Sequence, residues 1–83
     1  MTDAELQDLV KAALFSVAPD LEGEVVRLDE ALRGQFEIDS MDFLNFIIAL
    51  HQRTGIDIPE RDYASFETLS GAVAYLKSKG ARR

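Results

Sequence analysis

Residues 37–50 read EIDSMDFLNFIIAL. Ser40 lies in this stretch where a polar loop meets a strongly apolar helix, with carboxylates on both sides at Asp39 and Asp42. Serine is a favoured N-cap, so we expect the helix to begin with Ser40 in that role. Unpaired N–H groups and the positive dipole end of the helix favour an anion there. In a chain with almost no other reactive side chains, this setting predicts a serine that is modified rather than one that catalyses.

The chain is short, acidic and free of cysteine. Its 83 residues suit one domain with one core, and its apolar fraction of 47% is typical of a globular protein. The lack of cysteine excludes disulfides, thiolate chemistry and most structural zinc sites. We therefore expect a single domain over residues 1–83.

The formal net charge of −6 is unevenly distributed. Residues 1–42 hold eleven acidic and three basic side chains, whereas residues 43–83 hold four and six. Because a negative chain repels phosphate backbones, nucleic-acid binding is not expected. Partners with basic surfaces are favoured instead.

Nothing in the sequence predicts a membrane protein. The longest apolar run, residues 46–50, is far below the roughly 20 residues that a membrane span needs. The acidic, helix-starting segment Met1–Glu5 does not resemble a signal peptide. We expect a cytoplasmic monomer with no membrane insertion.

Hydrophobic spacing and capping residues predict four helical segments. The first, about 3–17, begins with a capping box at Thr2 and Glu5 and ends before Pro19. The second, about 40–54, ends before Gly55, which suits a helix C-terminus. A short helix at about 60–65 and a last helix at about 69–79, capped by Thr68 or Ser70, precede a tail at 80–83.

Residues 18–39 form a long connection without a sustained period. Loops of this length are uncommon in compact domains unless they are functional or held against the core. A turn of helix is expected at Asp29–Leu32, and the apolar residues that would anchor the loop are Val25, Val26, Leu28, Leu32 and Phe36. The predicted fold class is all-α: a small bundle of three main helices and one short helix, with a long first connection.

The second helix carries apolar residues on two faces. Phe43, Phe46, Ile47 and Leu50 share the face that we assign to the core. A second face holds Met41, Leu44 and Ile48, together with Asn45 and Gln52. The other helices of so small a bundle easily cover only one face, so we expect an exposed stripe that docks a partner, with Asp42 and Asn45 beside it. The alternative is that the last helix covers the stripe.

The segment DSMDF, residues 39–43, resembles the Asp-Ser-Leu signature of acyl carrier proteins. The resemblance continues through IDIP, residues 56–59, and the closing helix, and so covers nearly the whole chain. It implies that Ser40 carries 4′-phosphopantetheine, installed from coenzyme A by a phosphopantetheinyl transferase. It implies also that Asp39 helps to present the serine to the transferase and its magnesium, and that the helix after the serine is the main recognition helix.

A carrier of this kind is not an enzyme. In the reaction that the resemblance implies, the transferase supplies the base, and the Ser40 hydroxyl attacks the β-phosphate of coenzyme A. The pyrophosphate bond breaks, and adenosine 3′,5′-bisphosphate leaves. The resemblance implies two further kinds of partner: a ligase or acyltransferase that loads an acyl or aminoacyl group, and a condensing, transferring or hydrolysing enzyme that removes it.

The chain departs from the family pattern in three places. Met41 replaces leucine, and Glu37 replaces a glycine that often stands two residues before the aspartate. Carriers of fatty-acid synthases often place carboxylates along the exposed side of the recognition helix, where this chain has Asn45, His51, Gln52 and Arg53. A dedicated pathway is therefore favoured over housekeeping fatty-acid synthesis.

A long acyl chain would be sheltered between the second helix and the last. The candidate lining residues are Phe46, Ile47, Leu50, Ile58, Leu69 and Val73. Each of them is also expected in the core, and a small polar cargo needs no shelter.

A Ser-His-Asp hydrolase is excluded by spacing. Ser40 and the only histidine, His51, are eleven residues apart on one predicted helix, or roughly 16 Å along its axis.

Glu37, Asp39 and Asp42 would make weak contacts with magnesium or simply complement the helix dipole, and we expect no metal site. Fatty acyl, polyketide and aminoacyl or peptidyl cargo remain open, as does an unmodified helical interaction module.

Overall fold

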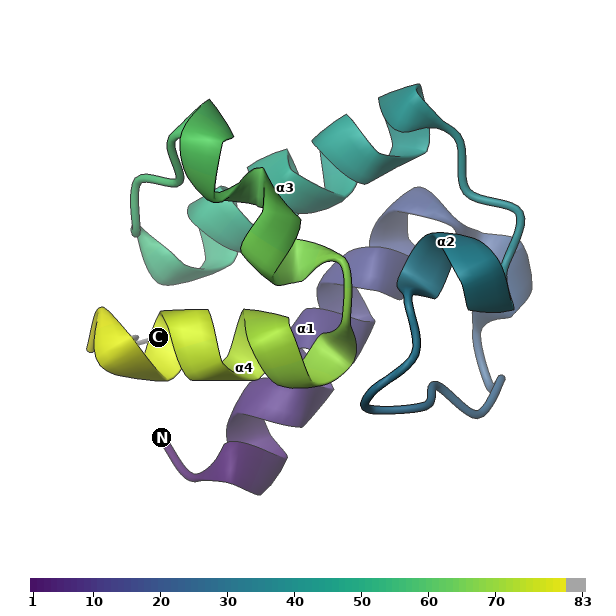
Figure 1. Cartoon of the computed structure of the whole chain (residues 1–83). Helices are drawn as coiled ribbons and strands as arrows, with labels where there is room; N and C mark the ends of the chain where they lie inside the picture. The colour runs from purple at the N-terminus through teal and green to yellow at the C-terminus, as the bar shows by residue number, and fades with distance from the viewer. Residues whose placement is uncertain (81–83) are drawn as a thin grey trace.

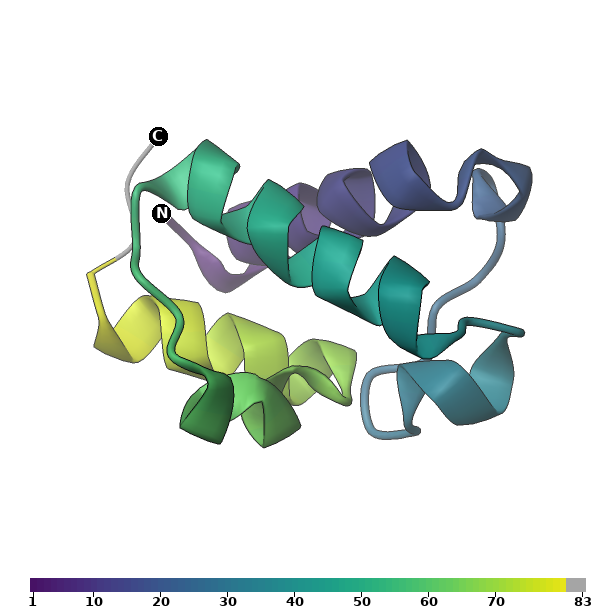
Figure 2. The ribbon, with the colours of Figure 1, turned by 90° about the horizontal axis from the view of Figure 1, so that it is seen from above.

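Helix α1 packs against both α3 and α4, and the three form a small bundle (Figures 1 and 2). The computed structural model describes residues 1–80. Every regular element in that range is helical, which confirms the all-α fold class. In chain order the elements are α1 (Asp3–Val17), the 3₁₀ helix η1 (Pro19–Leu21), α2 (Leu32–Gln35), α3 (Ser40–Thr54), the 3₁₀ helix η2 (Glu60–Phe66) and α4 (Leu69–Ser78).

The ends of α1 follow from its sequence. The Glu5 N–H donates to Thr2 Oγ1 at 3.1 Å and the Thr2 N–H donates to Glu5 Oε1 at 2.8 Å, which is the expected capping box. The helix ends at Val17, and Pro19 opens η1. This agrees with the restriction that a proline places on the residue before it.

One apolar cluster holds the bundle together. It joins the inner face of α1 to those of α3 and α4, and Phe66 of η2 closes it. Phe43 is only partly buried at its edge. The members from the three long helices are Leu6, Val10, Ala13, Leu14, Phe46, Ile47, Leu50, Leu69, Ala72, Val73 and Leu76.

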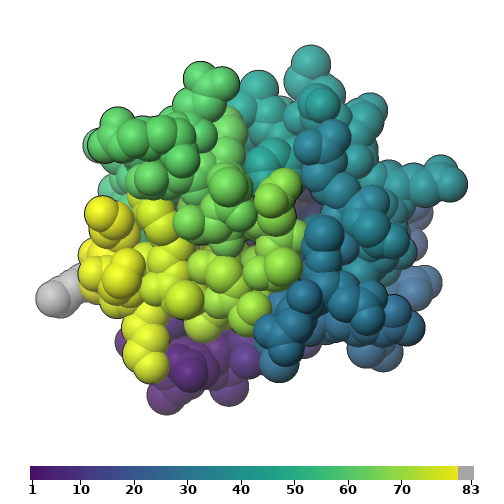
Figure 3. Space-filling model, viewed as in Figure 1, coloured from purple at the N-terminus to yellow at the C-terminus, as the bar shows by residue number. Residues whose placement is uncertain are grey.

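The connection between α1 and α3 lies against the start of α4 (Figure 3). The Leu32 N–H donates to the Glu67 carbonyl at 2.7 Å, and the Ser70 N–H donates to the Leu28 carbonyl at 2.9 Å. Val26, Leu32 and Ile38 are buried in the core. The connection is therefore held against the core, as the sequence predicts.

Two expected details of this connection are wrong. Val25 is 83% exposed and Leu28 is also exposed, because Val26 occupies the inward position of its segment. The helical turn lies at Leu32–Gln35 rather than at Asp29–Leu32. The Gln35 amide donates to the carbonyls of Arg27 and Glu30 and accepts from the Arg27 N–H, so these backbone groups are satisfied without a helix.

Helix α3 begins at Ser40, but its N-cap is Asp39, so the expected capping role of Ser40 is wrong. Asp39 is extended, with φ −86° and ψ 179°, and its Oδ1 accepts from the Asp42 N–H at 2.8 Å. Aspartate and serine are about equally favoured as caps, and here the carboxylate takes the role. At the other end, Gly55 adopts φ 72°, the left-handed conformation expected after a helix.

Helix α4 is capped by Thr68, whose Oγ1 accepts from the Gly71 N–H at 3.0 Å. None of the helices within residues 1–80 has the length and apolar character needed to cross a membrane. Of the expected tail at 80–83, residues 81–83 lie outside the described residues.

Tyr75 joins α4 to η2. Its hydroxyl donates to Asp62 Oδ2 at 2.8 Å, and its ring centre lies 4.8 Å from that of Phe66. Burial raises the pKa of the Tyr75 hydroxyl, and the hydrogen bond to Asp62 raises it further.

Asp39→Ala should lower the free energy of unfolding by about 1 kcal/mol, because it removes the cap of α3. Ser40→Ala should cost less, since its hydroxyl takes no part in the cap. Urea unfolding followed by circular dichroism measures both, and equal losses would contradict the assignment of Asp39 as the cap.

Tyr75→Phe should reduce stability by about 1 kcal/mol at neutral pH, because it removes one hydrogen bond. The folded pKa of Tyr75 lies above its unfolded value, so the tyrosine contributes its stability below that unfolded value of about 10 and loses it as pH rises through the folded pKa. Urea unfolding across this pH range should show that the difference in free energy of unfolding between wild type and variant becomes smaller at alkaline pH. A difference that does not change with pH would contradict the raised pKa of Tyr75.

Candidate functional site

Ser40 is the first residue of α3, and its side chain is exposed. Asp39 satisfies the next N–H groups of the helix: its Oδ1 accepts from Asp42 and its carbonyl accepts from Phe43 at 3.0 Å. The N–H groups of Ser40 and Met41 lie in the first turn of α3 and have no carbonyl of their own helix to bind. An anion attached to Ser40 would therefore lie at the positive end of a 15-residue helix.

Arg33 of α2 contacts Ser40. Its Nη2 donates to Ser40 Oγ at 3.3 Å, and its guanidinium carbon lies 5.8 Å from the ring centre of Phe43. Both views of the ribbon place α2 at the same end of the molecule as the first turn of α3 (Figures 1 and 2). Arg33 is not among the site residues predicted from the sequence, because its contact with Ser40 depends on how a non-helical segment brings α2 to α3.

Carboxylates surround the same helix start. Glu37, Asp39 and Asp42 line a shallow pocket of about 330 Å³ together with Ile38. Within residues 1–80, no three histidine, aspartate or glutamate side chains are placed to hold a metal ion. Asp39 and Asp42 complement the dipole of α3 at its positive end.

The second apolar face of α3 is exposed, as predicted. Met41 is 64% exposed, Leu44 39% and Ile48 43%, so the last helix does not cover this stripe. Asn45 is exposed next to it, and Asp42 is half-buried. The residues lie three and four positions apart and form one continuous surface that begins beside Ser40. Its role in docking stays a prediction.

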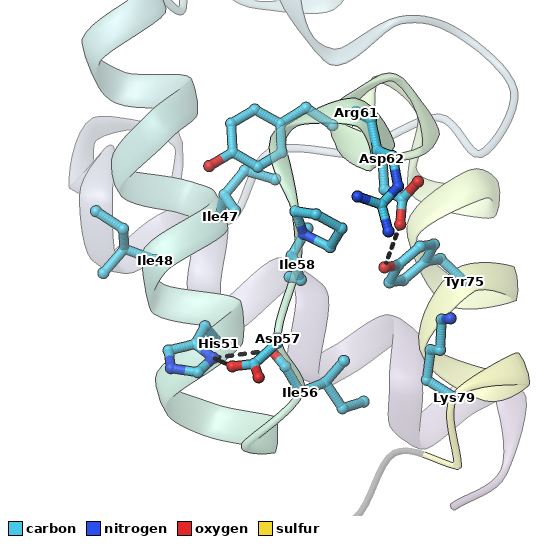
Figure 4. Close-up of a pocket in the computed structure, with 12 residues that line it drawn as sticks. Ile47, Ile48, His51, Ile56, Asp57, Ile58, Arg61, Asp62, Tyr75 and Lys79 are labelled. Carbon is cyan, nitrogen blue, oxygen red and sulfur yellow. Dashed lines mark hydrogen bonds and ion pairs between the residues drawn. The ribbon is translucent and has the colours of Figure 1, made fainter.

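An open cleft of about 760 Å³ lies between the C-terminal half of α3 and the pair η2 and α4 (Figure 4). Ile47 and Ile48 come from α3, and Tyr75 and Lys79 come from α4. The segment 56–59 crosses between these walls and contributes its two isoleucines. Along α3 the cleft is lined by Ile47, Ile48 and His51, and it carries charged groups where η2 and α4 border it.

Only two of the six expected lining residues, Ile47 and Ile58, border this cleft. Phe46, Leu50 and Leu69 are at most 1% exposed and belong to the core. Val73 borders a different shallow pocket beside Leu28 and Lys77. A lining role for these four residues stays a prediction that requires the helices to move apart.

His51 stabilises the end of α3 rather than the start. Its Nδ1 lies 2.8 Å from the Ile56 carbonyl and 3.7 Å from Asp57 Oδ1 (Figure 4). Helix α3 is continuous between Ser40 and His51, so the two side chains are separated by eleven residues of helix, roughly 16 Å. They cannot act as a nucleophile and its base.

Comparison with known proteins identifies the family. A family model described as a phosphopantetheine attachment site matches residues 6–76. The acyl carrier protein of Treponema pallidum (strain Nichols) is 33% identical over 67 residues, which cover 81% of this chain and 86% of the relative. The acyl carrier protein of Treponema denticola is 31% identical over 75 residues, 90% of each chain. That of Campylobacter hominis is 30% identical over 74 residues, covering 89% of this chain and 87% of the relative.

The matched region runs from the first half of α1 to the second half of α4, and it contains Arg33 of α2 and Ser40 at the start of α3. The residues present there fit a phosphopantetheine arm: an exposed hydroxyl, unpaired helix N–H groups and an arginine. This chain belongs to the acyl carrier protein family, and 4′-phosphopantetheine is its covalent cofactor.

Proposed function

We propose that Ser40 is the attachment residue and that the chain is an acyl carrier. The observation that carries this proposal is the exposed Ser40 hydroxyl on the first residue of α3, directly after Asp39. Three other serines already donate their hydroxyl protons within the chain: Ser16 to the Ala13 carbonyl, Ser78 to the Tyr75 carbonyl and Ser70 to Asp29. The Ser40 hydroxyl instead accepts a hydrogen bond, from Arg33.

The chain's own contribution is to present and hold the group. Asp39 fixes the first turn of α3 and so sets the position of Ser40, and the free N–H groups of that turn favour the negative charge of a phosphodiester. When bound, the arm supplies a terminal thiol that holds cargo as a thioester, a group that this cysteine-free chain does not have. The transferase supplies the base for attachment.

The pathway that we propose is a specialised one, of the fatty-acid, polyketide or a related type. The exposed side of α3 beyond Asp42 carries Asn45, Gln52 and Arg53 rather than a row of carboxylates. An enzyme that recognises an acidic helix would find only Asp39 and Asp42. An aminoacyl or peptidyl carrier of the same fold is the alternative.

The exposed stripe of Met41, Leu44 and Ile48 is the surface that we propose for docking the phosphopantetheinyl transferase. It starts next to Ser40, so an enzyme whose active site reaches this hydroxyl is brought against it. Burying these side chains would remove apolar surface from water, which favours association. The same surface would serve the enzymes that load and unload the arm.

Incubation with coenzyme A, magnesium and a promiscuous phosphopantetheinyl transferase should add the mass of one phosphopantetheine, mapped to Ser40 by peptide mass spectrometry. Ser40→Ala should abolish the gain while the protein stays folded, because the cap of α3 is Asp39.

Ser70→Ala is the matched control, since Ser70 is also a helix-start serine, and it should be modified like the wild type. A gain that survives Ser40→Ala would contradict the attachment residue. No gain in a folded wild type, with the transferase active on a control carrier, would favour the unmodified interaction module.

Leu44→Lys should lower kcat/KM of the transferase by about five- to tenfold, the effect of losing an interface contact worth slightly more than 1 kcal/mol. Val25→Lys places the same charge on another exposed apolar side chain and should leave kcat/KM unchanged. Circular dichroism should show full helicity for both variants. Unfolding of Leu44→Lys, or equal rates for both, would contradict the docking surface.

A further inference from the structure

Arg33 is held next to Ser40 by two contacts. Its Nη2 donates to Ser40 Oγ at 3.3 Å, and the guanidinium lies over the Phe43 ring, with 5.8 Å between its carbon and the ring centre. Phe43 is itself partly buried and packs beside Phe46 and Tyr63, with ring centres 6.1 and 6.5 Å away. The ring is therefore a fixed platform, and a cation over an aromatic face is attracted to it.

The guanidinium has donors left for an anion. Within residues 1–80, Arg33 forms no ion pair with a carboxylate, whereas Arg27 of the same connection pairs with Glu30 at 2.9 Å. A guanidinium carries five N–H donors in a planar fork that matches phosphate oxygens. The neutral Ser40 hydroxyl, at 3.3 Å, is a weak acceptor for such a group.

The carboxylates around Ser40 mean that a nearby cation would stabilise a phosphodiester attached to this serine. Glu37, Asp39 and Asp42 lie around the start of α3, so a phosphodiester on Ser40 would add a negative charge to an acidic region. Arg33 is the basic side chain that contacts Ser40. A hydrogen bond between ionised partners is roughly twice as strong as one between neutral partners.

We propose that Arg33 binds the phosphodiester of the phosphopantetheine arm and so links the arm to α2. This rests on Ser40 being the attachment residue. The guanidinium exchanges its hydroxyl acceptor for phosphate oxygens while it stays over Phe43. Since the Leu32 N–H of α2 binds the carbonyl of Glu67, between η2 and α4, modification of Ser40 stabilises the long connection as well as the arm.

The test compares apo and holo forms of the wild type, Arg33→Gln and the matched control Arg27→Gln. Both variants remove one positive charge from the same connection, and only Arg33 contacts Ser40. Intact mass first establishes complete modification of each. Urea unfolding then gives the change in the folding equilibrium constant on modification, and phosphorus NMR gives the chemical shift of the phosphodiester.

Modification should raise the folding equilibrium constant of the wild type and of Arg27→Gln by roughly two- to fivefold at low salt, the range for an exposed ion pair. In Arg33→Gln the increase should be clearly smaller or absent, because the new charge then lies among carboxylates with only the N-terminus of α3 to favour it. About 1 M salt should remove the gain in the wild type, a comparison that needs no variant to fold. The phosphorus shift should move in Arg33→Gln and stay in Arg27→Gln.

The two proposals fail in different ways. A folded wild type that gains no mass on Ser40 overturns the proposed function, and the role of Arg33 with it. A fully modified chain in which Arg33→Gln matches Arg27→Gln, in stability gain and in phosphorus shift, overturns the role of Arg33 alone. A wild-type gain that is unchanged by salt also overturns it.

Discussion

Two backbone hydrogen bonds between the long connection and the segment where η2 passes into α4 determine where the Ser40 region lies. The Leu32 N–H donates to the Glu67 carbonyl, and the Ser70 N–H donates to the Leu28 carbonyl. Together these bonds hold α2 at the end of the bundle. Leu32 is 1% exposed, and burying a leucine side chain contributes roughly 1.5–3 kcal/mol. Since α2 carries Arg33 and leads directly into α3, its position decides which groups stand beside the Ser40 hydroxyl. The connection has little regular structure of its own, yet it is the part of the fold that shapes the site.

Helix α3 serves the core and the surface at once. Its Phe46, Ile47 and Leu50 are buried against α1 and the rest of the core. The opposite stripe stays in water, because α1 covers one face of α3 and α4 packs on α1 instead. Exposed apolar side chains grouped in this way add little to the stability of the folded chain, and the docking of a partner against them stays a prediction. The bundle is thus large enough to fix the helix and small enough to leave one side of it free.

Local chemistry made most elements predictable, whereas tertiary placement decided the rest. Pro19 ends α1 by restricting the residue before it, and Gly55 ends α3 because glycine itself readily adopts a left-handed conformation. Asp39 and Ser40 are both good caps, and only the extended backbone of Asp39 separates them. The choice of Val26 over Val25 as the buried residue depends on the direction in which the connection crosses the core. The exposed stripe could be predicted from helical spacing, but Arg33 could not, because no periodic pattern relates it to Ser40.

The exposed stripe and the cleft meet at one residue. Ile48 belongs to the stripe and also borders the cleft, while Leu44 belongs to the stripe alone. From Ser40 to Ile48 is eight residues of α3, about 12 Å along the helix axis. An enzyme docked along the stripe would therefore cover the route from the serine to the cleft. Substituting Ile48 changes both surfaces, so its effect on an enzyme that handles cargo has two possible origins. Leu44 is the residue whose substitution separates docking from any role of the cleft.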